Sequence, residues 1–494
     1  MKVMLPRSSN LRFAVGAACL AVWACASQAP PQPTAPDAKC RVAGSGSGAG
    51  RELTVAVAQP VEPARAPVPT NQAESLIFGF LYETLVGIDC EGELRPGLAA
   101  SWRSRDGDRL WELQLDSAAR FWDGTPVTAA DAAASLLARG REGIAAVGVH
   151  DAVTLTVRFE RPQPDGPQPL ADPALAVGRA GDGKWPLGTG PYRIEAAREV
   201  AGDRGDYPLI AVPLRGAAPT LRFRVRPGAD ERDMLDEGAD LLVTRDAAVI
   251  DYARMRSGLT LAALPWDRTY VLLAPAPATN ATDASRDSEG GRLPPEFREQ
   301  LARDAVRGTA RPHRGPSTRE ARCEGSGSAG AEPRAGHGER SHASATARIL
   351  YREADPIARQ LAGRIVALAG RAGAREAEDA LAGALVAAVP GLRAAGALQA
   401  MGLADRGFER ELGNRSALLY VVDVPSRAFD PCAWPGAAGH RTPWLRAPTP
   451  GSGVVIPLVD TRPYLVAREG LPALLVDGNG ALRFEAGVME RSHQ

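Results

Sequence analysis

The chain has 494 residues, and its 58 acidic and 58 basic side chains give a formal net charge of zero at pH 7. This balance excludes the strong net field that draws proteins to nucleic acid or to anionic membranes. The length is sufficient for two or three lobes with sizeable hydrophobic cores, so composition predicts a soluble globular protein.

The first 25 residues have the features of a secretory signal peptide. Three basic residues within the first twelve precede an apolar run, 13–23, which is too short to span a bilayer as a helix. The following Ala-Cys step resembles a bacterial lipobox with Cys25 as the acylated residue, although Trp23 is bulkier than the pattern prefers. Cys19 is a weaker candidate, and a plain signal peptide cleaved near Ala26 is the alternative. In each case we expect an exported protein.

Residues 26–50 are rich first in proline and then in glycine and serine, a composition that cannot form a core. They predict a flexible tether between a lipidated cysteine and a folded body. We therefore expect a periplasmic or cell-envelope location, with a lipid anchor in the membrane.

Export changes the interpretation of the remaining cysteines, because disulfides form in oxidising compartments. Cys40, Cys90, Cys323 and Cys432 allow three pairings, and the sequence does not choose between them. Their scatter lacks the C-x-x-C spacing of zinc ligands, so we expect no metal site.

The folded body is expected to start with an alternating strand at 53–58 and a helix at 71–79. The most informative stretch follows at 82–137. Within it, Trp-x-Leu-x-Leu at 111–115 has the period-two pattern of a half-buried strand, and Gly-containing turns flank the strand. Thr128 is then expected to cap a helix, with an acidic residue three positions later.

Two further segments add to this order. The sequence Trp-Pro-Leu-Gly-Thr-Gly-Pro-Tyr-Arg-Ile at 185–194 offers glycines and a proline for unusual backbone angles. A strand at 218–226, a helix at 230–238 and a strand at 239–243 predict a βαβ unit with parallel pairing, in which Asp240 has a structural role.

Beyond residue 280 the pattern weakens. Helical spacing occurs at 295–308, but the Ser/Gly/Arg-rich stretch 309–346 is expected to be a disordered insertion. Order is expected to return with a strand at 348–351, an Asp-Pro turn at 355–356 and a long helix to about 369. A buried strand is expected at 417–422, and further apolar segments lie at 454–459, 462–467 and 471–480.

The order of these segments resembles the family 5 extracellular solute-binding proteins, receptors that feed oligopeptides, dipeptides, nickel and similar solutes to ABC importers. The resemblance rests mainly on 82–137, 185–194 and 218–243. It implies an α/β, two-lobed periplasmic binding protein fold of type II, cluster C-like, with an additional small α/β subdomain in the first lobe.

The resemblance also implies a division of the chain. We expect, in order, a signal peptide with lipobox at 1–25, a flexible tether at 26–50, lobe I formed by 51–73, 186–270 and 446–494, a small subdomain of lobe I at 74–185, and lobe II at 271–445.

In this family the solute is enclosed between the lobes, which are joined by crossing strands. Trp266, Asp267, Arg268 and Tyr270 lie just before the expected crossing into the second lobe and are candidate ligand contacts. Aromatic rings offer flat apolar surface, and Asp and Arg recognise charge. A hinge strand with ordinary packing is the alternative for this segment, and Tyr82 is more typical of a core residue.

A second candidate group surrounds the Asp-Pro step at 430–431. Peptide receptors of this family often have a carboxylate three residues earlier, where it pairs with the ammonium group of the peptide. Here that position is Arg427, which would instead suit a carboxylate or phosphate. Asp423 or Asp430 could still serve, and Trp434 is a weaker candidate contact.

No catalytic arrangement is evident. The six histidines are scattered, and neither H-E-x-x-H nor G-x-S-x-G is present. His337 and His342 near Cys323 lie in the Gly/Ser/Arg tract and lack metal-ligand spacing. We therefore expect a binding protein without cofactor or metal rather than an enzyme; an exported hydrolase ranks last.

The leading hypothesis is a receptor that captures a peptide or other small solute and delivers it to an ABC permease and its ATPase subunits. We expect this receptor to be a monomer. The alternative is a degenerate relative with a structural or sensory role in the envelope and no transport. This alternative rests on Arg427, on the low-complexity insertion and on the absence of the Asn-Pro-x-Tyr-Trp element usual before the strand at Leu221.

Overall fold

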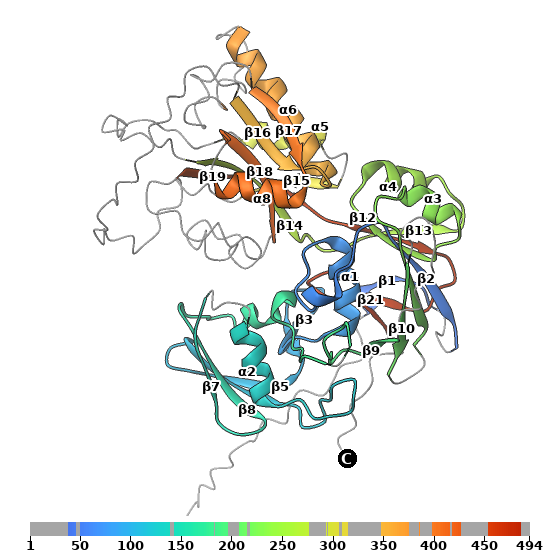
Figure 1. Ribbon diagram of the computed structural model, residues 1–494, viewed down its shortest axis with the longest axis vertical. Helices are drawn as coiled ribbons and strands as arrows, with labels where there is room; N and C mark the ends of the chain where they lie inside the picture. Colours follow the sequence, from blue (N-terminus) through green and yellow to red (C-terminus); the bar gives the residue numbers. More distant parts are fainter. Residues whose placement is uncertain are drawn as a thin grey trace, which may run out of the picture. The chain divides into compact units, whose positions relative to one another are not determined.

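Two separate open sheets, each with helices on both faces, organise the chain in the computed structural model (Figure 1). The structure describes residues 38–485 apart from 46–49, 139–142, 182, 196–206, 215–217, 276–292, 294, 306–308, 315–346, 375–384, 386–397, 415–416 and 426–452. Pro36–Gln494 form one compact unit.

The first sheet has seven strands in the order β13-β20-β12-β2-β11-β10-β9. Central β2 pairs in parallel with both β11 and β12, so the predicted βαβ unit has parallel strands with β2 between them. Asp240 has the expected structural role, because its carboxylate accepts a hydrogen bond from the Thr54 amide at 2.8 Å. The strands are β2 (Glu52–Val57), β9 (Tyr192–Glu195), β10 (Tyr207–Pro213), β11 (Thr220–Val225), β12 (Leu241–Thr244), β13 (Leu259–Ala263) and β20 (Tyr464–Arg468).

Alternation along the strands gives this sheet two apolar faces. Val55 and Phe223 face the core that contains α1 (Gln72–Leu81). The opposite face, with Leu242, packs against α3 (Glu231–Asp236) and α4 (Ala247–Arg254). A three-stranded sheet extends the first core and consists of β1 (Arg41–Ala43), β21 (Leu474–Val476) and β22 (Leu482–Phe484).

A smaller body follows α1 and has its own core. Its four-stranded antiparallel sheet has the order β5-β6-β8-β7, and α2 (Ala129–Ala138) packs against it. The predicted cap is present: the Thr128 amide donates to Asp131 at 2.9 Å, and the Asp131 amide donates to the Thr128 hydroxyl at 3.2 Å. The strands of this sheet are β5 (Ala99–Arg105), β6 (Leu110–Leu115), β7 (Ile144–Val149) and β8 (Thr154–Phe159). A separate two-stranded sheet consists of β3 (Val86–Ile88) and β4 (Leu94–Pro96).

Short 3-10 helices lie before α1 and after β8. They are η1 (Ala38–Cys40), η2 (Pro63–Arg65), η3 (Gln168–Ala171) and η4 (Pro173–Leu175).

The glycines of the segment 185–194 serve a different purpose from the one expected. Neither Gly188 nor Gly190 has a positive φ angle. Each lies against the end of α1 instead: a Cβ atom on Gly188 would be 2.2 Å from the Leu81 carbonyl oxygen. Glycine is therefore required there for close approach of two backbones.

The second sheet has six strands in the order β15-β19-β14-β18-β16-β17. Leu272 and Val421 face α5 (Pro295–Ala305) and α6 (Pro356–Ala374), whereas Val422 packs on the opposite face with α8 (Asp405–Gly413). The strands are β14 (Arg268–Pro275), β15 (Ala310–Pro312), β16 (Ala347–Arg352), β17 (Leu398–Leu403), β18 (Leu419–Pro425) and β19 (Gly453–Thr461).

Two details of this sheet differ from the expectations. Ala310–Pro312 form β15, which pairs with β19, so the prediction of disorder is wrong for the start of 309–346; residues 315–346 lie outside the described residues. The strand Gly453–Thr461 pairs within the second sheet, so the chain returns to the first sheet after Thr461 rather than at residue 446. Pairing of β15 with β19 decides the first difference and pairing of β19 with β14 decides the second, and the sequence reveals neither.

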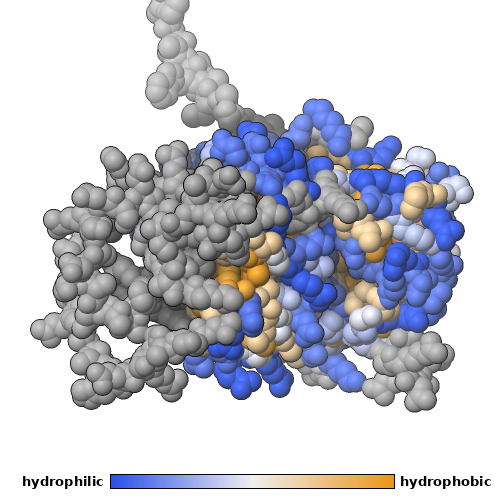
Figure 2. All heavy atoms as spheres, turned by 90° about the horizontal axis from the view of Figure 1, so that it is seen from above, coloured by the Kyte–Doolittle hydropathy of each residue, from blue (hydrophilic) through white to orange (hydrophobic). Residues whose placement is uncertain are grey.

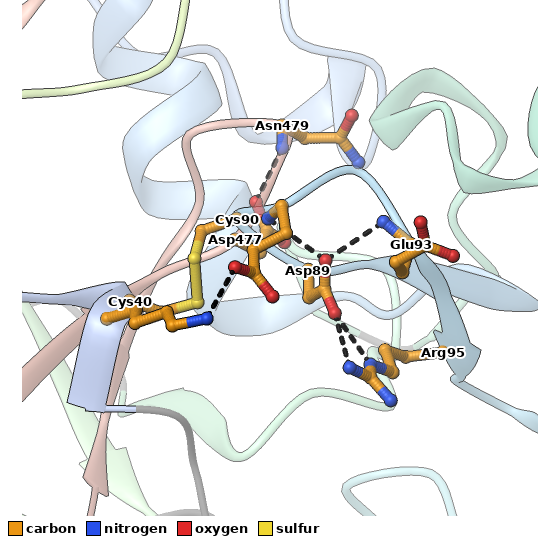
Figure 3. Close-up of a disulfide and its surroundings, with 9 residues drawn as sticks. Cys40, Asp89, Cys90, Glu93, Arg95, Asp477 and Asn479 are labelled. Atoms are coloured by element: carbon orange, nitrogen blue, oxygen red, sulfur yellow. Dashed lines mark hydrogen bonds and ion pairs between the residues drawn. A yellow bond between two sulfur atoms is a disulfide. The ribbon is translucent and has the colours of Figure 1, made fainter.

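A disulfide joins Cys40 to Cys90 (Figure 3). Cys40 precedes β1, and Cys90 follows Asp89 in the turn between β3 and β4. The Asp89 carboxylate organises this turn by accepting hydrogen bonds from the Glu91 and Glu93 amides at 3.0 and 2.9 Å. The bridge therefore fixes the N-terminal segment to a preformed turn, while Cys25, Cys323 and Cys432 lie outside the described residues.

The visible surface of the described residues is mainly hydrophilic, with smaller apolar areas (Figure 2). Large apolar side chains that are exposed among the described residues are Leu137, Val149, Met255 and Met401. Within the described part of the chain, no helix combines the length and apolar character needed to cross a membrane.

The disulfide gives a prediction about stability. Replacing both cysteines, Cys40→Ser with Cys90→Ser, opens a covalent link between residues 50 positions apart. We expect the free energy of unfolding to fall by about 2–4 kcal/mol, because the unfolded chain gains conformational freedom. Urea denaturation without reductant measures this. The matched control, Cys323→Ser with Cys432→Ser, keeps the bridge and should lose less; titration of free thiols at Cys40 and Cys90 in the native protein would contradict the assignment.

Candidate functional site

A pocket of about 920 Å³ is lined by residues of both large sheets. From the first sheet it receives the carboxyl ends of β2 and β12, and from the second sheet it receives the carboxyl ends of β16 and β18. β2 and β12 are parallel, as are β16 and β18. Ligands bind at this edge of parallel sheets, because loops and helix N-termini meet there.

Helices begin at the pocket wall, and their capping residues bring polar groups to it. Asp172, Asp230, Asp246 and Asp355 each accept a hydrogen bond from the backbone amide two residues later, at 2.7–3.0 Å. Asn71 caps α1 in a similar way, by accepting from the Glu74 amide at 2.9 Å. Capping requires a short polar side chain at each of these positions, so local helix chemistry determines much of the pocket lining.

On the side of the second sheet, two polar contacts form the pocket wall. The Tyr270 hydroxyl donates to the two Asp355 carboxylate oxygens at 2.9 and 3.1 Å. Arg268 pairs with Asp423 across β14 and β18, with an N···O distance of 2.6 Å. Burial raises the pKa of Asp355 to about 6, and the negative charge of Asp423 adds to the effect.

On the side of the first sheet, Glu231 is a half-buried carboxylate at the start of α3. It accepts a hydrogen bond from the Thr244 hydroxyl. Burial raises the pKa of Glu231 to about 7; the hydrogen bond from Thr244 opposes the shift, and the neighbouring charges of Asp246 and Asp230 add to it. Both sides of the pocket therefore hold carboxyl groups that ionise reluctantly.

The two sheets are joined by two chain crossings beside the pocket. One crossing connects β13 to β14 through residues 264–267, and the other connects β19 to β20 through residues 462–463. The crossings are hydrogen-bonded: the Leu264 amide donates to the Pro463 carbonyl at 3.0 Å, and the Asp267 amide donates to the Thr461 carbonyl at 3.3 Å. They form a two-stranded hinge.

Side chains reinforce the hinge. The Asp267 carboxylate forms an ion pair with Arg245, which also donates to Gln72 at 3.0 Å. The guanidinium groups of Arg311 and Arg462 each lie 4.5 Å from the centre of the Trp266 ring. Such cation–π contacts stabilise the packing of both crossings.

Comparison with known proteins shows which family this chain resembles. Residues 93–201 match the model of the bacterial extracellular solute-binding proteins, family 5 Middle. The periplasmic murein peptide-binding protein MppA of Escherichia coli is 39% identical over 71 residues, 14% of this chain and 12% of that protein. The periplasmic oligopeptide-binding protein OppA of the same organism is 43% identical over 58 residues, 12% of this chain and 10% of that protein. The matched segments are similar to the family 5 solute-binding proteins over part of the chain.

Solved structures extend the similarity of fold to most of this chain. NikA from Brucella suis, solved in complex with Fe(III)-EDTA, has a TM-score of 0.55 at 13% identity, covering 88% of this chain and 99% of its own. The murein tripeptide binding protein MppA has a TM-score of 0.54 at 14% identity, covering 90% and 98%. The two-lobed periplasmic binding protein fold expected from the sequence is confirmed.

The structure divides the predicted site residues into three groups. Arg268 and Tyr270 line the pocket. Trp266 and Asp267 belong to the hinge, which is the alternative that the sequence left open for this segment. The residues Arg427, Asp430 and Trp434 lie outside the described residues, so their roles stay predictions. Tyr82 is buried in the first core, as expected of a core residue.

Sequence reasoning missed Glu231, Asp246 and Asp355 as pocket residues. The sequence could have indicated them, because each carboxylate lies at the start of a helix that follows a strand or turn. Parallel strands bring such positions to one edge of the sheet, where ligands bind. Among the described residues, no group of three or more His, Cys, Asp or Glu side chains is arranged to hold a metal ion.

Glu231 provides a prediction about pH. Its pKa in the folded protein, about 7, exceeds the 4.5 of an ordinary glutamate, so ionisation destabilises the fold as the pH rises through this window. Glu231→Gln removes this effect and keeps a partner for Thr244. We expect a gain of about 1 kcal/mol in the free energy of unfolding at pH 8 and a smaller gain at pH 5. Thermal unfolding at both pH values measures the difference.

Asp233→Asn is the control for this measurement, because Asp233 is exposed on the same helix and does not line the pocket. It should change stability little at either pH. An equal effect of Glu231→Gln at pH 5 and pH 8 would contradict the assignment.

Proposed function

We propose that this protein is an extracytoplasmic receptor that captures a peptide or other small solute and delivers it to an ABC importer. The observation that carries the proposal is the pocket of about 920 Å³, lined by both sheets beside a hinge made of two crossings. Rotation about such a hinge brings the two walls together and excludes water from a bound solute. Capture in this way requires no chemical step.

The relatives support this class of ligand. The two Escherichia coli proteins are named for binding murein peptides and oligopeptides. This chain matches only about a tenth of the length of each of these two proteins. Their ligands therefore suggest a class of solute for this chain and do not identify it. Permease and ATPase subunits of an importer are the proposed partners, and the receptor is proposed to be a monomer.

The proposed organisation follows from the pairing of the strands. Lobe I comprises the first sheet and the small body carrying β5–β8, and lobe II comprises the second sheet from Arg268 to Thr461. A lipid on Cys25 would hold both lobes beside the membrane through the chain that precedes Ala38. The prediction of a flexible tether at 26–50 is wrong from Ala38 onward, because η1 and β1 belong to the folded body and Cys40 is disulfide-bonded.

Ligand-induced stabilisation tests the receptor function. We expect at least one member of a library of short peptides and small solutes to raise the melting temperature, because a ligand that binds only the folded state stabilises it. Small-angle X-ray scattering of the same mixture should show a smaller radius of gyration as the lobes close. If no solute raises the melting temperature or changes the scattering, the transport function should be abandoned in favour of a structural or sensory role.

The membrane anchor has a separate test. Cys25→Ser removes the thiol that would be acylated, so we expect the protein to move from the membrane fraction to the soluble fraction of cells. Cys19→Ser is the matched control and should leave the protein in the membrane fraction. Retention of the Cys25→Ser protein in membranes would count against lipidation at Cys25.

A further inference from the structure

The arginines that line the pocket are almost all neutralised by carboxylates of the protein itself. Arg232 pairs with Asp230, and Arg268 pairs with Asp423. Arg65 pairs with Glu74, and Arg245 pairs with Asp267. Arg352 pairs with both Asp405 and Glu409. These guanidinium groups are therefore poorly placed to attract an anionic solute.

The carboxylates of the pocket are not matched in the same way. Asp172, Glu231, Asp246 and Asp355 line the pocket and form no direct ion pair with a guanidinium group in the described part of the chain. The charges of Arg232 and Arg268 act on Asp246 and Asp355 without such a pair. Arg406 is the single pocket arginine that lacks a carboxylate partner among those residues. The described residues that line the pocket thus carry an excess of negative charge.

This excess is divided between the two walls. Glu231 and Asp246 belong to the side of the first sheet, where Thr244 and Asp230 are their polar neighbours. Asp355 belongs to the side of the second sheet, beside Tyr270 and Asp423. The raised pKa values of Glu231 and Asp355 agree with negative charge that is partly buried and incompletely balanced.

On the basis of the proposed receptor function, we propose that the solute is an organic cation, whose ammonium or guanidinium groups are held between Glu231 on one wall and Asp355 on the other. Closure of the hinge would bring both carboxylates to the solute, whose positive charge would balance theirs. Such groups occur both in free polyamines and in the basic side chains of short peptides.

Four probes, a polyamine and three tripeptides of different charge, test the charge preference of the wild-type protein by isothermal titration calorimetry. They are spermidine, arginyl-alanyl-arginine amide, N-acetylated glutamyl-alanyl-glutamate and a trialanine blocked at both ends. We expect one or both cations to bind, more weakly at high salt, and at least tenfold more tightly than the acidic or neutral peptide. Binding of spermidine but not of the basic peptide would identify a free amine as the solute, and the reverse would identify a peptide.

Two isosteric variants locate the interaction. Glu231→Gln and Asp355→Asn remove one negative charge each, and asparagine can still cap α6. Each should weaken binding of the preferred cation about ten- to hundredfold, the range expected for losing one hydrogen bond to a charged group. Asp233→Asn, on the same helix as Glu231 but outside the pocket lining, should bind as wild type does.

The outcomes separate this inference from the receptor function. If the acidic or neutral peptide binds as tightly as the cations, the charge preference is wrong and the receptor function stands. If neither cation binds wild type, the inference is also wrong, and the solute library decides the receptor function independently. Unchanged cation affinity in both folded variants would likewise overturn the assignment.

Discussion

The two crossings between the sheets are the constraint on which the rest of this structure depends. Residues 264–267 connect β13 to β14, and residues 462–463 connect β19 to β20. The two connections are hydrogen-bonded to each other or to the adjoining strand. Both crossings are short, so rotation about them is the movement that they would allow between the two sheets. The pocket lies beside this axis, so a small rotation changes the separation of its walls.

The charge of the pocket follows from the same topology. Parallel strands send their helix N-termini to one edge, and backbone amides there require capping groups. This chain uses aspartates for most of these caps, including Asp246 and Asp355. Carboxylates that stabilise individual helices therefore accumulate in one cavity, where burial and their mutual repulsion oppose ionisation. The same side chains thus contribute to helix stability and to the charge of the pocket.

Local features of this fold could be predicted from the sequence, and long-range pairings could not. The cap formed by Thr128 and Asp131 joins residues three apart, so the sequence contains the whole interaction. Order of motifs also sufficed for the family and the two lobes. The approach of Glu231 and Asp355 to one pocket depends on how two sheets are joined, and the pairing of Cys40 with Cys90 depends on where β1 docks. No local pattern encodes either.

The position of β20 has a consequence for how the chain reaches its final form. This strand, Tyr464–Arg468, is inserted between β12 and β13 and is hydrogen-bonded to both. The first sheet therefore cannot be completed until the ribosome has made nearly the whole chain, since its inner strand arrives late in synthesis. A chain with such a late-closing sheet remains open during synthesis, which is compatible with threading through a membrane before folding.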